Sequence, residues 1–258
     1  MTMGGDTRGA SRPRETLQRS IAWYLRQLSR VMNVLTDDEL DRLIPLLTER
    51  RFGSRQLIFG AGDLADRLYL VMKGRVKIFQ VADNGKEIIL EIVEKGGIVG
   101  DMAIVENGER IASAQALEEA VALSISWSDF YHVVQQSPRL GFAMVELMAR
   151  RLVRMQRAFT SIVSMPVSAR LAQVFLSRAR DGHVELGLTH QELAQTIGTS
   201  RETVTALISR FCALGAIEPE ESGHCVRDSE LLEAIGCGDV SVSPRHPAPS
   251  VSTTSALP

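Results

Sequence analysis

The stretch LTHQELAQTIGTSRETVTALISRF, residues 188–211, decides how this chain is interpreted. Gly198 divides it, and Ser200 is of a residue type that caps helix N-termini. Apolar residues recur at helical spacing on both sides of the glycine: Leu193, Ala194, Ile197, Val204, Leu207 and Ile208. Two short helices joined by a tight glycine turn form a helix-turn-helix, whose second helix enters the major groove of DNA.

The beginning of the second predicted helix carries side chains that can read bases. Arg201 can donate to both acceptors of guanine, and Glu202 can accept from the amino group of cytosine. The other polar residues nearby can contact phosphate or fix the position of the backbone. The predicted DNA-contacting residues are Thr189, Gln191, Ser200, Arg201, Glu202, Thr203 and Thr205.

Residues 52–126, further upstream, have a different pattern. Short apolar runs follow one another about every ten residues, separated by Gly/Asn-rich turns, which favours an antiparallel β-roll. The predicted strands are 56–59, 68–72, 76–81, 88–93, 112–116 and 120–125. Asn84-Gly85 predicts a two-residue hairpin turn with positive φ at both positions.

Helical periodicity surrounds the roll. Glu15–Met32 predicts one helix, and Thr36 to about Leu47 a second that begins with a capping box between Thr36 and Glu39. A helix from Pro138 to Met165 is longer than most globular helices, which favours pairing between two chains over packing on its own β-domain. The predicted dimer contacts are Met144, Leu147, Met148, Leu152 and Met155.

The predicted fold class is α+β, with an N-terminal antiparallel β-roll, a long dimerisation helix and a C-terminal helix-turn-helix. The expected boundaries are 1–32 for a tail and extra helix, 33–136 for the roll, 137–165 for the long helix, 166–237 for the DNA-binding domain and 238–258 for a disordered tail.

The overall charge balance gives no sign of nucleic-acid binding. The chain has 258 residues, of which 45% are hydrophobic, and a formal net charge of −2. Residues 138–217 hold ten arginines and five acids, whereas residues 218–237 hold one arginine and six acids. DNA binding must therefore depend on local basic surface and not on the net charge.

Several classes of protein are excluded or disfavoured. No apolar run approaches the roughly 18–20 residues of a membrane span, and the polar N-terminus lacks the apolar core of a signal peptide. These features predict a cytoplasmic protein without membrane contact. No nucleophile–base motif or P-loop appears, so we expect no enzyme. The remaining alternative is a ligand-sensing module that regulates a protein partner without binding DNA.

The cysteines and histidines predict no cofactor. Cys212, Cys225 and Cys237 are odd in number and widely spaced, which argues against disulfides. His224, Cys225 and Cys237 do not follow a metal-binding spacing, so no metal is expected. No cysteine precedes Cys212, which excludes an N-terminal iron–sulfur cluster. No histidine lies between Phe52 and Tyr131, which disfavours haem ligation by the strands of the roll.

Residues 35–228 resemble the family of the cyclic-AMP receptor protein and the fumarate-nitrate regulator. Three segments carry the resemblance: GTSRETV (198–204) is similar to the recognition segment, MARRL (148–152) to the long dimer helix, and residues 98–113 occupy the place of the nucleotide-phosphate cassette. The resemblance implies a β-roll of the cyclic-nucleotide-binding type and a winged helix-turn-helix. It also implies a homodimer, a palindromic operator, contact with RNA polymerase and a small-molecule effector.

This sequence departs from the pattern of the cyclic-AMP-responsive members. Ala206 stands where they carry a third base-reading arginine, so we expect a related operator with lost preference at one base pair. In the cassette, Asp101 replaces a glutamate and Ile111 a small hydroxyl residue; on the long helix, Met155 and Gln156 replace a Thr-Ser pair. The predicted effector pocket comprises Gly100, Asp101, Met102, Ala103, Arg110, Ile111, Met155 and Gln156. Another ligand, no ligand and cyclic AMP remain three alternatives.

Overall fold

The structure is a computed structural model that describes residues 12–104, 108–221 and 223–244. It divides into two compact units, Met1–Val153 and Arg154–Pro258, and each is considered by itself below. The division falls within the long helix α5 (Pro138–Ser164). Most of the two predicted tails, at 1–11 and 245–258, lies outside the described residues. No described helix combines the length and apolarity that crossing a membrane requires.

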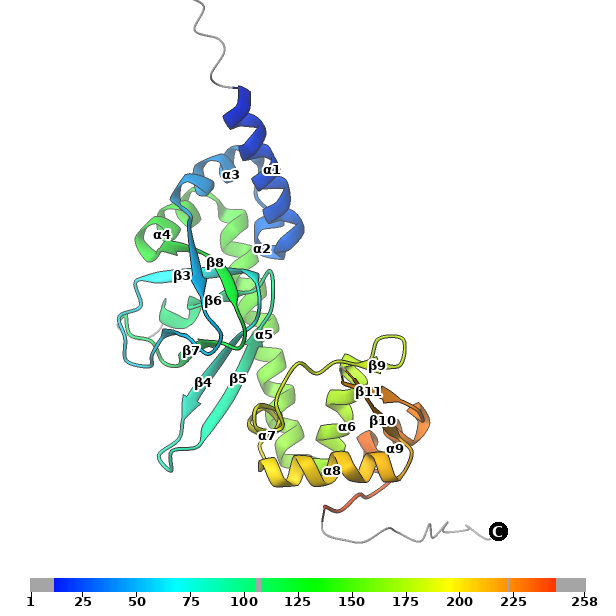
Figure 1. Ribbon diagram of the computed structural model, residues 1–258. Coiled ribbons are helices and arrows are strands. Elements are labelled where there is room, and N and C mark those ends of the chain that lie inside the picture. Colours follow the sequence, from blue (N-terminus) through cyan, green and yellow to red (C-terminus); the bar gives the residue numbers. More distant parts are fainter. Residues whose placement is uncertain (1–11, 105–107, 222, 245–258) are drawn as a thin grey trace, which may run out of the picture. The chain divides into compact units, whose positions relative to one another are not determined.

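The first unit is built on two antiparallel four-stranded sheets (Figure 1). One sheet has the order β1-β8-β3-β6, and its strands are β1 (Thr48–Phe52), β8 (Ala120–Ser126), β3 (Arg67–Lys73) and β6 (Ile98–Val99). The other has the order β2-β7-β4-β5, with β2 (Leu57–Phe59), β7 (Ser113–Ala116), β4 (Val76–Val81) and β5 (Glu87–Val93). The sequence predicts an antiparallel roll and six of these eight strands, all but β1 and β6. Val71, Val76 and Ala114 are buried in the roll.

The hairpin between β4 and β5 corrects one prediction. Only Gly85 has a positive φ, at 77°, so Asn84 does not adopt the conformation expected of it. The amide of Ala82 donates to the Lys86 carbonyl, and that of Gly85 to the Ala82 carbonyl. The loop therefore contains three residues and ends on a left-handed glycine. Hairpin loops of this kind are among the most common after two-residue loops.

Helices at the N-terminal side pack on the roll. They are α1 (Arg12–Leu28), α2 (Arg30–Asn33), α3 (Asp37–Leu43) and the 3-10 turn η1 (Ile44–Leu46), where the sequence predicts two longer helices. Ala22 and Leu25 of α1 are buried in the same core as Leu40 and Phe130. The extra N-terminal helix is therefore part of the first unit's core.

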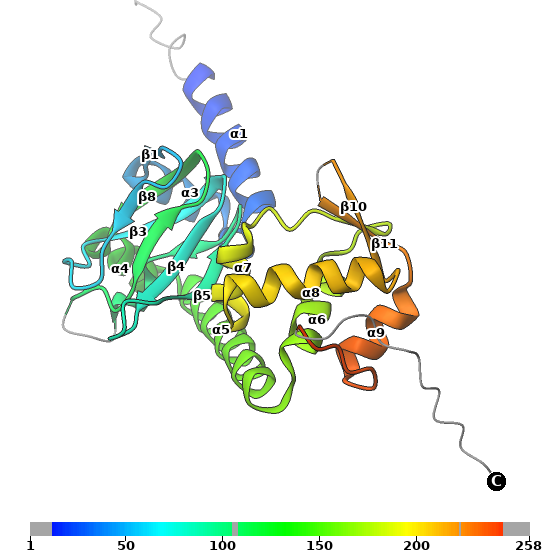
Figure 2. The same cartoon turned by 60° about the horizontal axis from the view of Figure 1, so that its bottom comes forward.

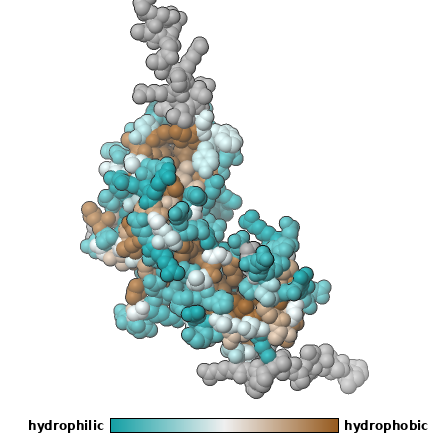
Figure 3. Space-filling model, in the orientation of Figure 1, coloured by the Kyte–Doolittle hydropathy of each residue, from teal (hydrophilic) through white to brown (hydrophobic). Residues whose placement is uncertain are grey.

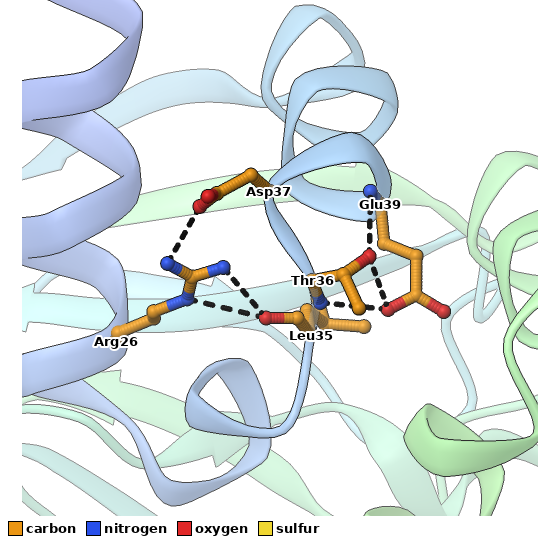
Figure 4. Close-up of polar contacts among 5 residues, drawn as sticks. All are labelled: Arg26, Leu35, Thr36, Asp37 and Glu39. Atoms are coloured by element: carbon orange, nitrogen blue, oxygen red, sulfur yellow. Dashed lines mark hydrogen bonds and ion pairs between the residues drawn. The ribbon is translucent and has the colours of Figure 1, made fainter.

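Polar contacts fix the connection between α1 and α3 (Figure 4). Arg26 donates through Nη2 and Nε to the Leu35 carbonyl, at 2.8 and 3.2 Å, and its Nη1 lies 2.7 Å from the Asp37 carboxylate. The Glu39 amide donates to Thr36 Oγ1, and the Thr36 amide donates to Glu39 Oε2. This is the predicted capping box, which satisfies two amides at the beginning of α3.

The second unit contains the C-terminal part of α5 and a compact helical domain with a small sheet (Figure 2). Its helices are α6 (Val167–Arg178), α7 (His190–Ile197), α8 (Arg201–Ala213) and α9 (Ser229–Cys237). Its sheet has the order β10-β11-β9, with β10 (Ile217–Glu220), β11 (Gly223–Val226) and β9 (His183–Val184). Phe175, Leu193, Leu207, Phe211 and Leu232 are fully buried in one core.

Candidate nucleic-acid interface and effector cassette

The predicted helix-turn-helix is present as α7 and α8. Gly198 ends α7 in the left-handed conformation with φ of 71°, which a glycine adopts without the steric cost that a side chain would add. The six apolar residues of the predicted inward faces are all buried in the domain core. Packing therefore fixes the angle between the two helices and leaves the N-terminal turn of α8 at the surface.

Several hydroxyl groups of the predicted interface hold the helix ends. The Glu192 amide donates to Thr189 Oγ1 at 3.2 Å, and the Thr203 amide donates to Ser200 Oγ at 3.2 Å. Thr205 donates to the Arg201 carbonyl and hydrogen-bonds His190 Nδ1 at 2.9 Å. Thr189 and Ser200 thus cap α7 and α8. Their hydroxyls fix the helix N-termini, which is consistent with positioning the helices for contact with DNA.

Arg201, Glu202 and Gln191 are exposed on the two helices. A hydrogen bond from its own backbone amide, followed by one from Ser200, lowers the pKa of Glu202, so its carboxylate is charged at neutral pH. An ionised carboxylate accepts hydrogen bonds only, which suits the cytosine amino group. His190, which links α7 to α8 through Thr205, was missed because a histidine on a helix surface carries no distinctive sequence pattern.

In the first unit, the cassette follows β6 as the 3-10 turn η2 (Asp101–Ile104). Arg110 returns to it from 10 residues away: Nη1 donates to the Gly100 carbonyl at 3.0 Å and Nη2 to the Arg67 carbonyl at 2.7 Å. Its guanidinium carbon lies 4.1 Å from the centroid of the Phe59 ring. Burial lowers the pKa of Arg110, but a guanidinium stays charged in proteins.

Arg110 and Gly100 approach each other closely. Gly100 has φ of 91°, and a Cβ there would lie 2.6 Å from Nη1 of Arg110 and 3.0 Å from the Arg67 carbonyl oxygen. A glycine is therefore required for the arginine to reach this place. Arg110 is only 4% exposed. Among the described residues, Nη1 and Nη2 of its guanidinium each donate to a carbonyl, and Nε has no hydrogen-bond acceptor. A buried cation held mainly by neutral groups is suited to binding an anion.

Asp101 is engaged by Arg151 of α5. Nη1 of Arg151 lies 2.7 Å from each oxygen of the Asp101 carboxylate, and its Nε lies 2.7 Å from Glu91 Oε2. Burial lowers the pKa of Arg151, but Asp101 and then Glu91 outweigh this effect, so the pKa lies above its ordinary value. Both carboxylate oxygens of Asp101 therefore already accept from a cation, a contact between residues 50 apart that the sequence could not reveal.

The structure brings together only part of the predicted pocket. Gly100, Asp101 and Arg110 meet around the cassette, and Met102 is half-buried beside them in sequence. Ile111 is half-buried, and its carbonyl accepts from Gln80. The side chain of Ala103 is outside the described residues. Met155 and Gln156 are exposed on the part of α5 that belongs to the second unit.

Two of the residues of α5 that the sequence predicts as dimer contacts lie against the core of their own unit. Met144 is buried and Leu147 partly buried against the core of their own unit. A second face of α5 carries apolar side chains at spacings of 3, 3, 4, 3 and 4 residues, and all of them are exposed except the half-buried Met148. We call it the α5 stripe: Phe142, Val145, Met148, Leu152, Met155 and Phe159. The helix therefore packs on its own β-domain through one face and presents an apolar stripe on another.

Residues 49–137 match the cyclic nucleotide-binding domain family, and residues 169–235 match the Crp-like helix-turn-helix domain family. The cyclic AMP receptor protein of Thermus thermophilus is 31% identical over 205 residues, which cover 79% of this chain and 95% of that protein. The chain belongs to the family of the cyclic AMP receptor protein. It is a transcription regulator with an effector-binding domain and a DNA-binding helix-turn-helix, which sets aside the alternative without DNA.

Other relatives and a solved structure are also similar to this chain. A CRP-like cAMP-activated global transcriptional regulator of Mycobacterium tuberculosis is 32% identical over 183 residues, covering 68% of this chain and 82% of that one. The solved structure of the c-di-GMP-responsive regulator CLP of Xanthomonas campestris has a TM-score of 0.66 at 22% identity, covering 75% of this chain and 100% of that one. At that identity the match supports the fold alone.

Proposed function

We propose that this family member acts as a homodimer on a palindromic operator, and that its β-roll responds to an effector other than cyclic AMP. We also propose contact with RNA polymerase, which the resemblance to the family supports. The proposed activity is regulatory and not catalytic. The α5 stripe is the observation that supports the dimer, because two recognition helices related by a two-fold axis require two chains.

The spacing of the α5 stripe is what distinguishes it from ordinary exposed apolar residues. Figure 3 shows apolar side chains between polar ones at several places on the surface, so exposure alone does not mark an interface. Leu152 and Phe159 are 67% and 70% exposed, and with Val145 they repeat every seven residues. Met148 and Met155 lie between them, as the second apolar position of a heptad does. A heptad seam of this kind is the pattern of a helix that pairs with a second helix.

Replacing Phe159 with glutamate should convert the dimer into monomers, because the substitution places two like charges in the paired seam. Sedimentation velocity at micromolar concentration measures the change. Arg157→Glu is the matched control, since Arg157 is exposed two residues away and lies opposite the seam in the heptad. If Phe159→Glu remains dimeric, the stripe is not the dimer interface.

The contacts of the cassette support a different effector. Both oxygens of Asp101 accept from Arg151, so a ribose hydroxyl would have to compete with a buried ion pair. Ile111 offers no side-chain hydroxyl next to Arg110. Arg110, in contrast, remains a buried cation with carbonyl partners, which suits an anionic group. The positive charge needed to bind an anion is therefore present. The side chains that could hydrogen-bond a sugar are fewer, because Asp101 is already paired and Ile111 has no hydroxyl.

The test is binding of the full chain to a fluorescent palindromic operator of the family type, with and without cyclic AMP. We expect binding that weakens steeply as salt rises, because phosphate contacts release counterions, and an affinity that cyclic AMP leaves unchanged. Binding that requires cyclic AMP contradicts the effector proposal and leaves the DNA-binding function intact. Salt-insensitive binding, or equal binding to unrelated duplexes, contradicts the operator proposal.

A further inference from the structure

Three potential metal ligands of different types meet on the small sheet of the second unit. A ligand atom of His183, a carboxylate oxygen of Glu220 and Sγ of Cys225 all lie within 4.8 Å of one another. They come from β9, β10 and β11, so each strand of the sheet supplies one. We propose that these residues form a zinc site, separate from the effector cassette of the first unit.

The sheet register builds the cluster. Cys225 pairs directly with His183 across β11 and β9, and Glu220 ends β10 opposite Gly223. Gly223 has φ of 139°, and a Cβ there would overlap the Val184 carbonyl. The glycine thus permits β11 to approach β9 closely, and this approach places the thiol beside the imidazole. Backbone hydrogen bonds, and not mobile loops, hold the ligands together.

The chemistry of the three groups selects the metal. Imidazole nitrogen, thiolate sulfur and carboxylate oxygen together form a borderline donor set, which suits zinc better than magnesium or calcium, whose ligands are all oxygen. In tetrahedral zinc sites with bonds of about 2.0–2.3 Å, ligand atoms lie about 3.3–3.8 Å apart. The three ligand atoms lie within 4.8 Å of one another, so no pair exceeds that range by more than about 1 Å. Three protein ligands leave a fourth position for water.

The contacts that these three side chains make are weak enough to be replaced by bonds to a metal. His183 Nδ1 lies 2.9 Å from Glu220 Oε2, and the His183 side chain is 67% exposed, so this pair stabilises the fold little. The Cys225 thiol makes a long contact of 3.6 Å with the Val226 carbonyl. The neighbouring acid, Glu218, is already paired with Arg227 at 2.6 Å. On binding, the Cys225 thiol releases its proton to solvent and its sulfur bonds the metal.

This assignment differs from the set His224, Cys225 and Cys237, whose spacing in the sequence predicts no metal site. His224 instead packs with its ring centroid 5.4 Å from that of Phe175. Cys237 is exposed at the end of α9. The actual neighbours of Cys225 lie 42 residues before it in the chain and five residues before it, a spacing that no compact metal motif has.

The experiment titrates cobalt(II), as a spectroscopic substitute for zinc, into the reduced, metal-free full chain. We expect one cobalt per chain, thiolate-to-cobalt charge-transfer absorption in the near ultraviolet, the visible bands of four-coordinate cobalt, and loss of both on adding zinc. Cys225→Ser should abolish the charge-transfer band and weaken binding at least tenfold. Cys212→Ser and Cys237→Ser are the matched controls and should bind like the wild type.

Glu220→Gln provides a variant that leaves the fold unchanged, because Glu220 is exposed and Gln has the same shape. It should weaken cobalt binding at least tenfold while keeping the circular dichroism spectrum and the melting temperature of the metal-free protein. Zinc should raise the melting temperature of the wild type by several degrees and that of this variant by less. The proposal would be overturned by a charge-transfer band that persists in Cys225→Ser or disappears in Cys237→Ser. A titration that saturates below one cobalt per chain would overturn it as well.

Discussion

Replacing Arg201 with alanine should cost about 1–3 kcal/mol of binding free energy at each operator half-site, and about twice that for a dimer on two well-separated half-sites. Arg201 is the first residue of α8, and its side chain is exposed. The cap of α8 comes from Ser200, whose hydroxyl accepts from the Thr203 amide, so the helix keeps its N-terminus in the variant. The lost free energy is therefore that of contacts to DNA.

Specificity distinguishes a base contact from a phosphate contact. Fluorescence anisotropy should show that Arg201→Ala binds the operator and an operator changed at one guanine with similar affinity, whereas the wild type discriminates between them. Arg180→Ala, an exposed arginine outside the helix-turn-helix, is the control and should keep the discrimination. An equal loss by Arg201→Ala on every duplex would make Arg201 a phosphate contact. Ala206→Arg should add a guanine preference at one further base pair.

The helix-turn-helix could be predicted from sequence because its signals are local. Two capping residues, a left-handed glycine and two apolar faces all lie within 24 residues, and each depends on spacing along one helix or across one turn. Most strands of the roll could be predicted from short apolar runs and turn residues for the same reason. The strand β1 (TERRF) was missed because it is mostly exposed and has no apolar alternation. The strand β10 was missed because it contains Pro219, and proline disfavours a strand except at a sheet edge, which is where β10 lies.

The candidate sites were less predictable, because their partners are distant in sequence. Arg110 was found from its resemblance to the family's cassette, but Arg151, the partner of Asp101, could be found only from the fold. On α5, an apolar period near 3.6 residues includes both the buried face with Met144 and the exposed stripe with Leu152. Periodicity shows that such residues exist on a helix, but burial alone shows which of them remain available to a second chain.

Arg151→Met should destabilise the first unit by about 3–5 kcal/mol, because it leaves the charge of Asp101 buried without its partner. The Asp101 side chain is 2% exposed, and Arg151 supplies both of its short hydrogen bonds from a side chain that is 12% exposed. Methionine retains much of the volume of the arginine stem, so the loss reflects charge more than packing. Chemical denaturation monitored by circular dichroism measures the difference in unfolding free energy.

The neighbouring arginine provides the control. Arg150 also forms an ion pair, with Glu146 one helical turn away, but both side chains are more than half exposed, so Arg150→Met should change stability by less than about 1 kcal/mol. Adding Asp101→Asn to Arg151→Met should restore part of the lost stability, since a neutral amide needs no counter-charge. If the two arginine variants are equally stable, the Asp101 pair does not hold η2 to α5. If the double variant is instead less stable than Arg151→Met alone, hydrogen bonds to the carboxylate, and not its buried charge, determine the stability of this contact.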